Sequence, residues 1–223
     1  MVRRQQNVTQ IGMKVVVFFV LLCMVFIFAC GLWIWFVVLL RDYPCADWCV
    51  LYRDLFMLSF YLCGMNAVDL LHLRKDDYCN GRIRYKRRKT GYLFDLPVVD
   101  AAAIIERYMG AGELLLSPME RYTDYHDFVR RWNEGLRKIG PHDVVEDKIG
   151  KKRKVVYLPL FPSLTTYWAR HSWATLATSL DIPRDIVAEC LGHSWADVTS
   201  IYIVSDTRRV DAAVRRVADA LCG

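Results

Sequence analysis

Residues 166–175 read Thr166-Tyr167-Trp168-Ala169-Arg170-His171-Ser172-Trp173-Ala174-Thr175, and they lie inside a helix that the sequence predicts over residues 165–180. Further along the chain, a second segment reads Leu191-Gly192-His193, and Tyr202 follows this histidine by nine residues. Arginine binds phosphate, histidine moves protons and a tyrosine hydroxyl can act as a nucleophile. The candidate chemistry of the chain therefore lies in these C-terminal segments.

A basic β-hairpin is predicted upstream of them. Over residues 82–89, Ile83 and Tyr85 alternate with Arg84 and Lys86, which is typical of a half-exposed strand. The turn Thr90-Gly91 then leads into a second strand over residues 92–99. The first strand carries enough positive charge to contact a phosphate backbone, although a run of this kind is also typical of a solvated surface.

The remaining segments are mostly helical in pattern. Asp100 is a candidate N-cap for a helix that Gly110 closes, and Gly140-Pro141 ends another. The predicted helices cover residues 54–63, 66–73, 100–109, 124–139, 165–180, 183–192, 196–203 and 207–221, and a short strand covers 155–160. The expected fold class is α+β, mostly helical, with a small antiparallel sheet.

Four segments occur in a specific order: Gly64-Met65-Asn66-Ala67-Val68-Asp69-Leu70, the hairpin ending Arg88-Lys89-Thr90-Gly91, residues 166–175, and Leu191-Gly192-His193 with Tyr202. Together they resemble the catalytic domain of tyrosine recombinases, the phage-integrase family. The resemblance covers residues 50–223. It implies the tyrosine recombinase catalytic-domain fold, whereas the N-terminal core-binding domain of the family has no counterpart here, which suggests a truncated relative.

The resemblance also implies roles for individual residues. Tyr202 would be the nucleophile that forms a 3′-phosphotyrosyl bond with DNA, and Arg170 would clamp the phosphate. Lys89 would protonate the leaving 5′-oxygen, and His193 would contact a phosphate oxygen or help activate the tyrosine. Asp69 falls at an acidic position that supports the site. No metal or cofactor is implied.

Two positions depart from the pattern of the family. Asn66 stands where its first arginine is expected, and Tyr167 stands where a histidine is expected. Loss of one phosphate-binding group can lower a rate by about 10²–10³-fold, while the hydroxyl of Tyr167 still offers a hydrogen bond. Arg53, in the preceding helix, is a candidate for the missing guanidinium.

The N-terminal segment, residues 1–41, is hydrophobic. Residues 15–40 contain no charged residue and no proline, which predicts a transmembrane helix followed by a linker at 42–49. A buried helix of the domain is the alternative. The flanking positive charges weakly favour an orientation that places the rest of the chain outside, which conflicts with a DNA enzyme.

Composition and charge fit a globular protein with a polyanionic partner. The net charge is +6 and 24% of residues are charged. None of the eight cysteines forms a Cys-x2-Cys pair, and their placement in apolar runs indicates a reducing compartment rather than a disulfide framework. The expected partners are double-stranded DNA and further copies of the chain, as a tetramer on DNA. The catalytic domain would lie in the cytoplasm, anchored to the inner membrane through residues 15–40.

Two other functions fit the same segments. A non-catalytic, membrane-anchored DNA-binding protein derived from an integrase would keep the fold without using Tyr202. A type IB topoisomerase would use the same nucleophile but would relax supercoiled DNA of any sequence. The last predicted helix, 207–221, would pack either on its own domain or on a neighbouring subunit.

Overall fold

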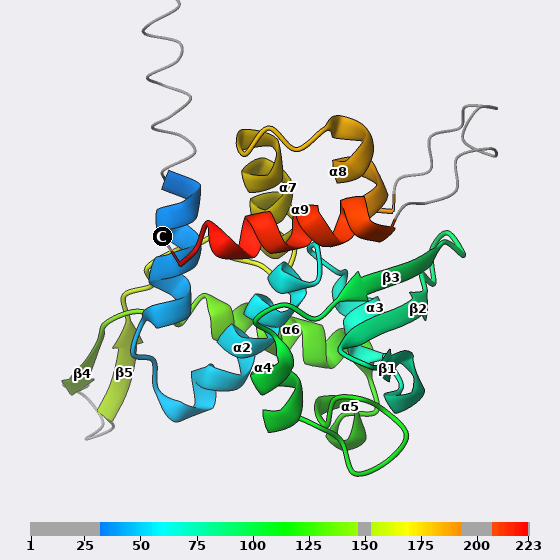
Figure 1. Ribbon diagram of the computed structural model, residues 1–223. Helices are drawn as coiled ribbons and strands as arrows, with labels where there is room; N and C mark the ends of the chain where they lie inside the picture. The colour runs from blue at the N-terminus through cyan, green and yellow to red at the C-terminus, as the bar shows by residue number, and fades with distance from the viewer. Residues whose placement is uncertain (1–31, 147–152, 193–206, 223) are drawn as a thin grey trace, which may run out of the picture.

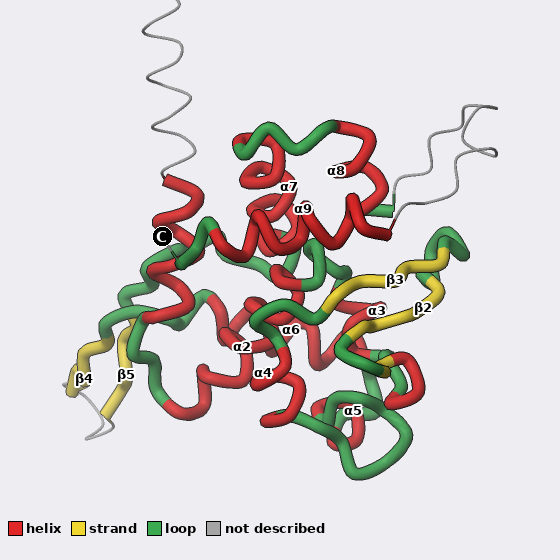
Figure 2. Tube along the Cα trace, viewed as in Figure 1, coloured by secondary structure: helices red, strands yellow, loops and turns green. Residues whose placement is uncertain are grey.

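The computed structural model describes residues 32–146, 153–192 and 207–222 of the chain. The predicted segment 196–203, His193 and Tyr202 fall outside these ranges, as does most of the predicted membrane span. The predicted fold class is confirmed at the level of α+β: helices dominate, and the strands form small antiparallel sheets (Figures 1 and 2).

Residues 32–42 form the first described helix. The helices that follow it are α2 (Asp47–Tyr61), α3 (Ala67–Leu71), a 3₁₀ turn (Lys75–Asp77), α4 (Ala102–Arg107), α5 (Pro118–Arg121), α6 (Tyr125–Leu136), α7 (Trp168–Ser179), α8 (Arg184–Cys190) and α9 (Thr207–Asp219). The strands are β1 (Tyr78–Cys79), β2 (Arg82–Lys86), β3 (Leu93–Pro97), β4 (His142–Glu146) and β5 (Arg153–Tyr157). One sheet has the order β1-β2-β3, and β4 pairs with β5 in a second sheet.

The predicted hairpin is β2–β3, and its alternation is confirmed. Tyr85 pairs with Phe94 in the antiparallel register, and their rings stack with centroids 5.0 Å apart. Ile83 and Tyr85 are buried, whereas Arg84 and Lys86 on the opposite face are exposed. The strand therefore places one row of side chains in the core and a basic row in solvent.

Helix α2 runs through the middle of the core. Phe56 and Phe60 of α2 are fully buried, as are Trp132 of α6 and Trp173 of α7. The indole of Trp132 donates to the backbone oxygen of Tyr52 at 2.8 Å, so even this buried polar atom is satisfied. In Figure 1, α7, α8 and α9 group on one side of this core and the three-stranded sheet lies beside it.

The last helix packs on its own domain. Val210, Val214 and Val217 of α9 are buried, and α9 contacts β3, α7 and α8. Of the two arrangements that the sequence left open for this helix, the single chain adopts the intramolecular one.

The structure changes two boundaries at the N-terminal side. Helix 32–42 includes part of the predicted membrane span, yet Val37 and Leu40 are fully buried and the Phe36 ring lies 4.6 Å from that of Phe161. These residues thus adopt the alternative, a helix that packs on the domain. The helix continues to residue 42 and α2 begins at Asp47, so the connection covers only residues 43–46. Within the described ranges, no helix is both long and apolar enough to cross a membrane.

Two local predictions were also wrong. Asp100 does not cap α4: its backbone has φ of +55°, the N-cap position is Ala101, and no side chain caps the helix. Strand β4 was missed because Gly140-Pro141 was interpreted only as a helix end, although β4 pairs with β5 along its whole length.

Candidate functional site

Arg170 lies in the first turn of α7, where three distant segments meet. Its side chain is buried and donates from Nη1 to the backbone oxygen of Gly64 at 3.3 Å and from Nη2 to that of Leu191. Gly64 follows α2 with φ of +65°, and a Cβ there would lie 2.2 Å from the Arg170 Cα. Only glycine allows the turn after α2 to approach the α7 backbone this closely.

Arg87 reaches the same place from the hairpin. It follows β2, is buried, and donates from Nη1 to the backbone oxygens of Gly192 at 2.9 Å and Leu191 at 3.3 Å. Gly192 ends α8 with φ of +63°, and a Cβ there would lie 2.2 Å from the Phe94 ring. The end of α8 is therefore packed directly against the hairpin, with two arginines on its carbonyls.

These two guanidinium groups place two positive charges in a largely buried part of the domain. Burial lowers the pKa of Arg170, and the positive charge of Arg87 lowers it further. Arginine nevertheless stays protonated in proteins, so two like charges remain close together. Such an arrangement favours an anion that bridges both groups, because the anion relieves their repulsion.

Asp69 fixes the hairpin against α3. This buried carboxylate accepts a hydrogen bond from the backbone nitrogen of Arg88 at 3.0 Å. Burial raises the pKa of the nearby Tyr85 hydroxyl, and the negative charge of Asp69 raises it further. Asp69 thus holds the chain immediately after Arg87 and before Lys89.

Other predicted site residues lie around this cluster. Asn66 is half-buried at the N-cap of α3, two residues after Gly64. Tyr167 is 53% exposed, and its ring meets that of His171 edge-on at 4.6 Å. It precedes Arg170 by one helical turn, and its backbone oxygen accepts from the Arg170 nitrogen at 3.1 Å. Lys89 is exposed in the turn at the tip of the hairpin.

Arg53 is not part of the cluster. Its guanidinium binds Asp54 within α2 at 3.2 Å and the backbone oxygen of Tyr43, which precedes α2, at 2.9 Å. The guanidinium that the structure brings to Arg170 is that of Arg87. The alternation of the strand could have identified Arg87, because it falls at every second position after Ile83 and Tyr85, on the buried face.

His193 and Tyr202 lie outside the described residues, so the structure gives no geometry for them. Gly192, whose carbonyl accepts from Arg87, immediately precedes His193 in the chain. Among the described residues, no group of three or more His, Cys, Asp or Glu side chains is placed to hold a metal ion.

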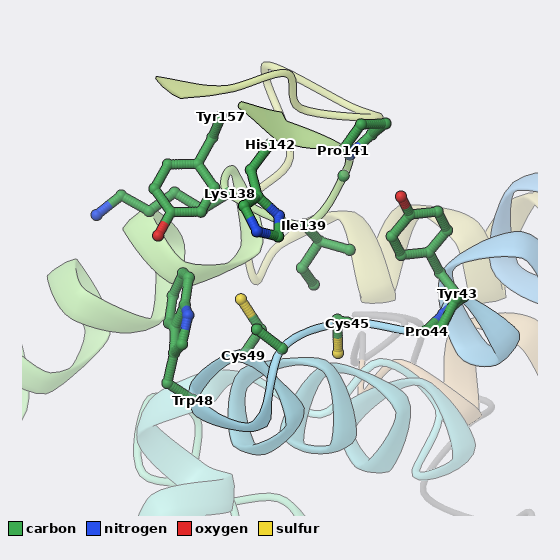
Figure 3. Close-up of a pocket in the computed structure, with 12 residues that line it drawn as sticks. Tyr43, Pro44, Cys45, Trp48, Cys49, Lys138, Ile139, Pro141, His142 and Tyr157 are labelled. Atoms are coloured by element: carbon green, nitrogen blue, oxygen red, sulfur yellow. The ribbon is translucent and has the colours of Figure 1, made fainter. Parts of the chain in front are cut away.

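A separate cavity of about 320 Å³ lies between the 43–46 connection, the end of α6 and the β4–β5 hairpin (Figure 3). Trp48 and Tyr157 form one wall with ring centroids 5.7 Å apart, and the Lys138 ammonium lies 5.7 Å from the centre of the Tyr157 ring. Burial raises the pKa of the Cys49 thiol to about 12. The lining shares no residue with the arginine cluster and contains no carboxylate, and its buried thiol is a poor nucleophile.

Comparisons of the chain with protein-family models, with curated proteins and with solved structures found no match.

Proposed function

We propose that this chain breaks and rejoins DNA strands in the manner of a tyrosine recombinase, with Tyr202 as the nucleophile. The observation that carries the proposal is the position of Arg170. It is buried where the segment after α2, the turn end of the hairpin and the end of α8 meet, and each of these segments contains part of the sequence pattern. A phosphate bound there would be within the reach of residues from all of them.

The proposed reaction conserves the energy of the bond that it breaks. The hydroxyl oxygen of Tyr202 attacks the phosphorus, the phosphorus–O5′ bond breaks, and a 3′-phosphotyrosyl ester forms. The tyrosine proton leaves through His193 or water, and Lys89 donates a proton to the departing 5′-oxygen. Arg170 stabilises the charge on the non-bridging oxygens. Attack by a 5′-hydroxyl on the ester then reverses these steps, so no nucleotide cofactor is consumed.

The surface around the cluster suits a DNA backbone. Arg84, Lys86, Arg88 and Lys89 are exposed along β2 and the turn that follows it, and the net charge of the chain is +6. Contacts of this kind are independent of sequence and weaken as salt concentration rises. They support DNA as the partner without indicating which bases are recognised. A tetramer on DNA remains part of the proposal.

The second candidate is a DNA-binding protein that does not cleave. Asn66 and the exposed Tyr167 favour it, because each replaces a group that the family pattern expects to contact phosphate. The two candidates differ in whether Tyr202 is needed. A third, the topoisomerase, differs from both because it would relax a plasmid of any sequence.

The deciding experiment traps the covalent intermediate. A pool of nicked duplexes with randomised sequence around the nick is incubated with the full chain, and the reaction is stopped with denaturant. Cleavage near the nick releases a short fragment that diffuses away, so the protein stays linked to DNA. We expect a protein–DNA band on a denaturing gel for the wild type and none for Tyr202→Phe.

The randomised pool also removes dependence on a known target site. A shifted complex on a native gel without any covalent band would support the non-catalytic alternative. A covalent band that persists in Tyr202→Phe would contradict the assignment of the nucleophile. Relaxation of a supercoiled plasmid without sequence preference would instead favour the topoisomerase.

A further inference from the structure

Arg87 has hydrogen-bonding capacity that its protein contacts do not use. In its described hydrogen bonds it donates only through Nη1, to the carbonyl oxygens of Leu191 and Gly192. The edge formed by Nε and Nη2 can donate two hydrogen bonds to two oxygens of one anion, and it makes no described hydrogen bond. No fully buried side-chain nitrogen or oxygen among the described residues lacks a partner, so Nε and Nη2 are not completely buried, although Arg87 as a whole is only 7% exposed.

The second arginine meets Arg87 at a shared acceptor on the Nη1 side. Arg170 donates to the same carbonyl oxygen of Leu191 that accepts from Arg87, and the charge of Arg87 contributes to lowering the pKa of Arg170. Two guanidinium groups that share one acceptor lie close enough to contact a single tetrahedral anion. Asp69 accepts a hydrogen bond through Oδ1 from the backbone nitrogen of Arg88.

We propose that Arg87 and Arg170 form one binding site for a phosphodiester anion, in which Arg87 supplies the second guanidinium that is missing at Asn66. The identification of the anion as a DNA phosphate rests on the proposed function. The presence of an anion site does not, because it is inferred from the unused Nε–Nη2 edge of Arg87 and from the acceptor that the two guanidinium groups share. Arg87 is thus assigned as a phosphate-binding catalytic residue in addition to its contacts with the end of α8.

The test uses inorganic phosphate and dimethyl phosphate as probes on the full chain. Thermal unfolding is followed at increasing probe concentration, against chloride at matched ionic strength. We expect each probe to raise the midpoint for the wild type, since a ligand that binds only the folded state stabilises it. Arg87→Lys keeps the charge and can still donate to a carbonyl, but it loses the two-pronged edge. It should bind the probes about tenfold more weakly.

Arg74→Lys is the matched control. It makes the same change at a residue that is exposed and paired with Glu113, and it should keep the response of the wild type. The midpoints of both variants in chloride alone report whether the fold is intact. Equal probe responses in Arg87→Lys and the wild type, or no response in the wild type, would overturn the anion site.

The covalent-trapping assay separates this inference from the proposed function. An anion response that depends on Arg87, without any Tyr202 adduct in the wild type, would keep the site and reject strand cleavage. A Tyr202 adduct that forms at the same rate in Arg87→Lys would keep strand cleavage and reject the role of Arg87.

Discussion

Arg82 and Asp211 lie 129 residues apart in the chain and form a two-pronged ion pair, with Nη1–Oδ2 at 2.7 Å and Nη2–Oδ1 at 3.0 Å. The Arg82 Nε also binds Asp95 at 2.5 Å across the hairpin. One guanidinium thus joins β2, β3 and α9. Together with the buried valines of α9, this contact holds the last helix against the hairpin whose turn carries Arg87.

Asp211→Asn should therefore weaken the fold measurably. The side chains of Arg82 and Asp211 are 22% and 35% exposed, and a partly buried, two-pronged pair contributes about 1 kcal/mol. Asp185→Asn is the control, because its pair with Arg209 is more exposed, at 59% and 51%, and should change stability by less than about 0.5 kcal/mol. Urea unfolding measures both, and equal effects would show that α9 does not depend on this ion pair.

Gly64→Ala should destabilise the protein far more than Gly81→Ala. Both glycines have positive φ, +65° and +70°, so each substitution has a backbone cost of about 1 kcal/mol. At Gly64 the added Cβ would also lie 2.2 Å from the Arg170 Cα, whereas at Gly81 it would meet nothing within 4 Å. We expect the additional loss at Gly64 to exceed about 2 kcal/mol, as measured by thermal unfolding. Similar losses would show that α7 does not pack this closely on the turn.

The helix at residues 32–42 should be part of the folding unit. Leu40 is fully buried and Leu32 is 51% exposed in the same helix. Leu40→Ala is expected to cost about 2–5 kcal/mol because it removes buried apolar surface and leaves a cavity, whereas Leu32→Ala should have little effect. Chemical denaturation of both variants measures the difference. A small effect at Leu40 would mean that this helix contributes little to the core.

The cysteines should differ in reactivity. Cys79 and Cys222 are exposed, whereas Cys49 and Cys63 are buried, and burial raises the pKa of the Cys49 thiol from 9.0 to about 12. Because the thiolate is the reactive form, alkylation at pH 8 followed by peptide mass spectrometry should modify Cys79 and Cys222 before Cys49 and Cys63. Early modification of Cys49 would contradict its buried position.

The same pKa predicts a pH dependence of stability. Below about pH 9, the Cys49 thiol is protonated in both the folded and the unfolded chain. Between pH 9 and about pH 12, the unfolded chain loses this proton while the folded chain retains it, so the free energy of unfolding falls as pH rises. Cys49→Ser should flatten this part of the pH profile. If the slope of the free energy of unfolding against pH is unchanged in Cys49→Ser, other groups cause the loss of stability at high pH.

Local patterns predicted most elements of the fold because the spacing of apolar residues shows which face of a strand or helix is buried. Ile83 and Tyr85 had to face the core, and the last helix carried its apolar residues at helical spacing. The failures arose where tertiary contacts decide the conformation. Asp100 is a good N-cap by composition, but the chain there adopts φ of +55° and the helix begins without a side-chain cap. For residues 32–42, nothing local indicates that the domain covers one face of the helix; the rest of the predicted span lies outside the described residues.

The candidate site was predicted only in part for a similar reason. Arg170 was identified from its segment, but Arg87 was interpreted as one charge in a basic run. Its role depends on the carbonyl oxygens of Leu191 and Gly192, more than 100 residues away, which no short motif contains. The sequence makes Arg53 a candidate for the same role, yet its contacts are with Tyr43 and Asp54.

The relation between Asn66 and Arg87 leads to a final prediction. If Arg87 supplies the guanidinium that Asn66 lacks, Arg87→Lys should slow formation of the Tyr202 adduct by about 10²-fold. Asn66 is half-buried, two residues after the carbonyl that accepts from Arg170, so an arginine introduced there would start close to the proposed phosphate. Asn66→Arg should therefore restore much of the rate that Arg87→Lys loses and change the wild-type rate much less.

The control for this rescue is Asn66→Gln, which lengthens the side chain without adding charge. It should not restore the rate, because the lost function is stabilisation of negative charge on the phosphoryl oxygens. Single-turnover rates of adduct formation at saturating protein separate this effect from changes in DNA affinity. Rescue by glutamine as well as arginine would point to packing at the start of α3. Failure of arginine to rescue, with the double variant still folded, would argue that the two positions do not serve the same phosphate.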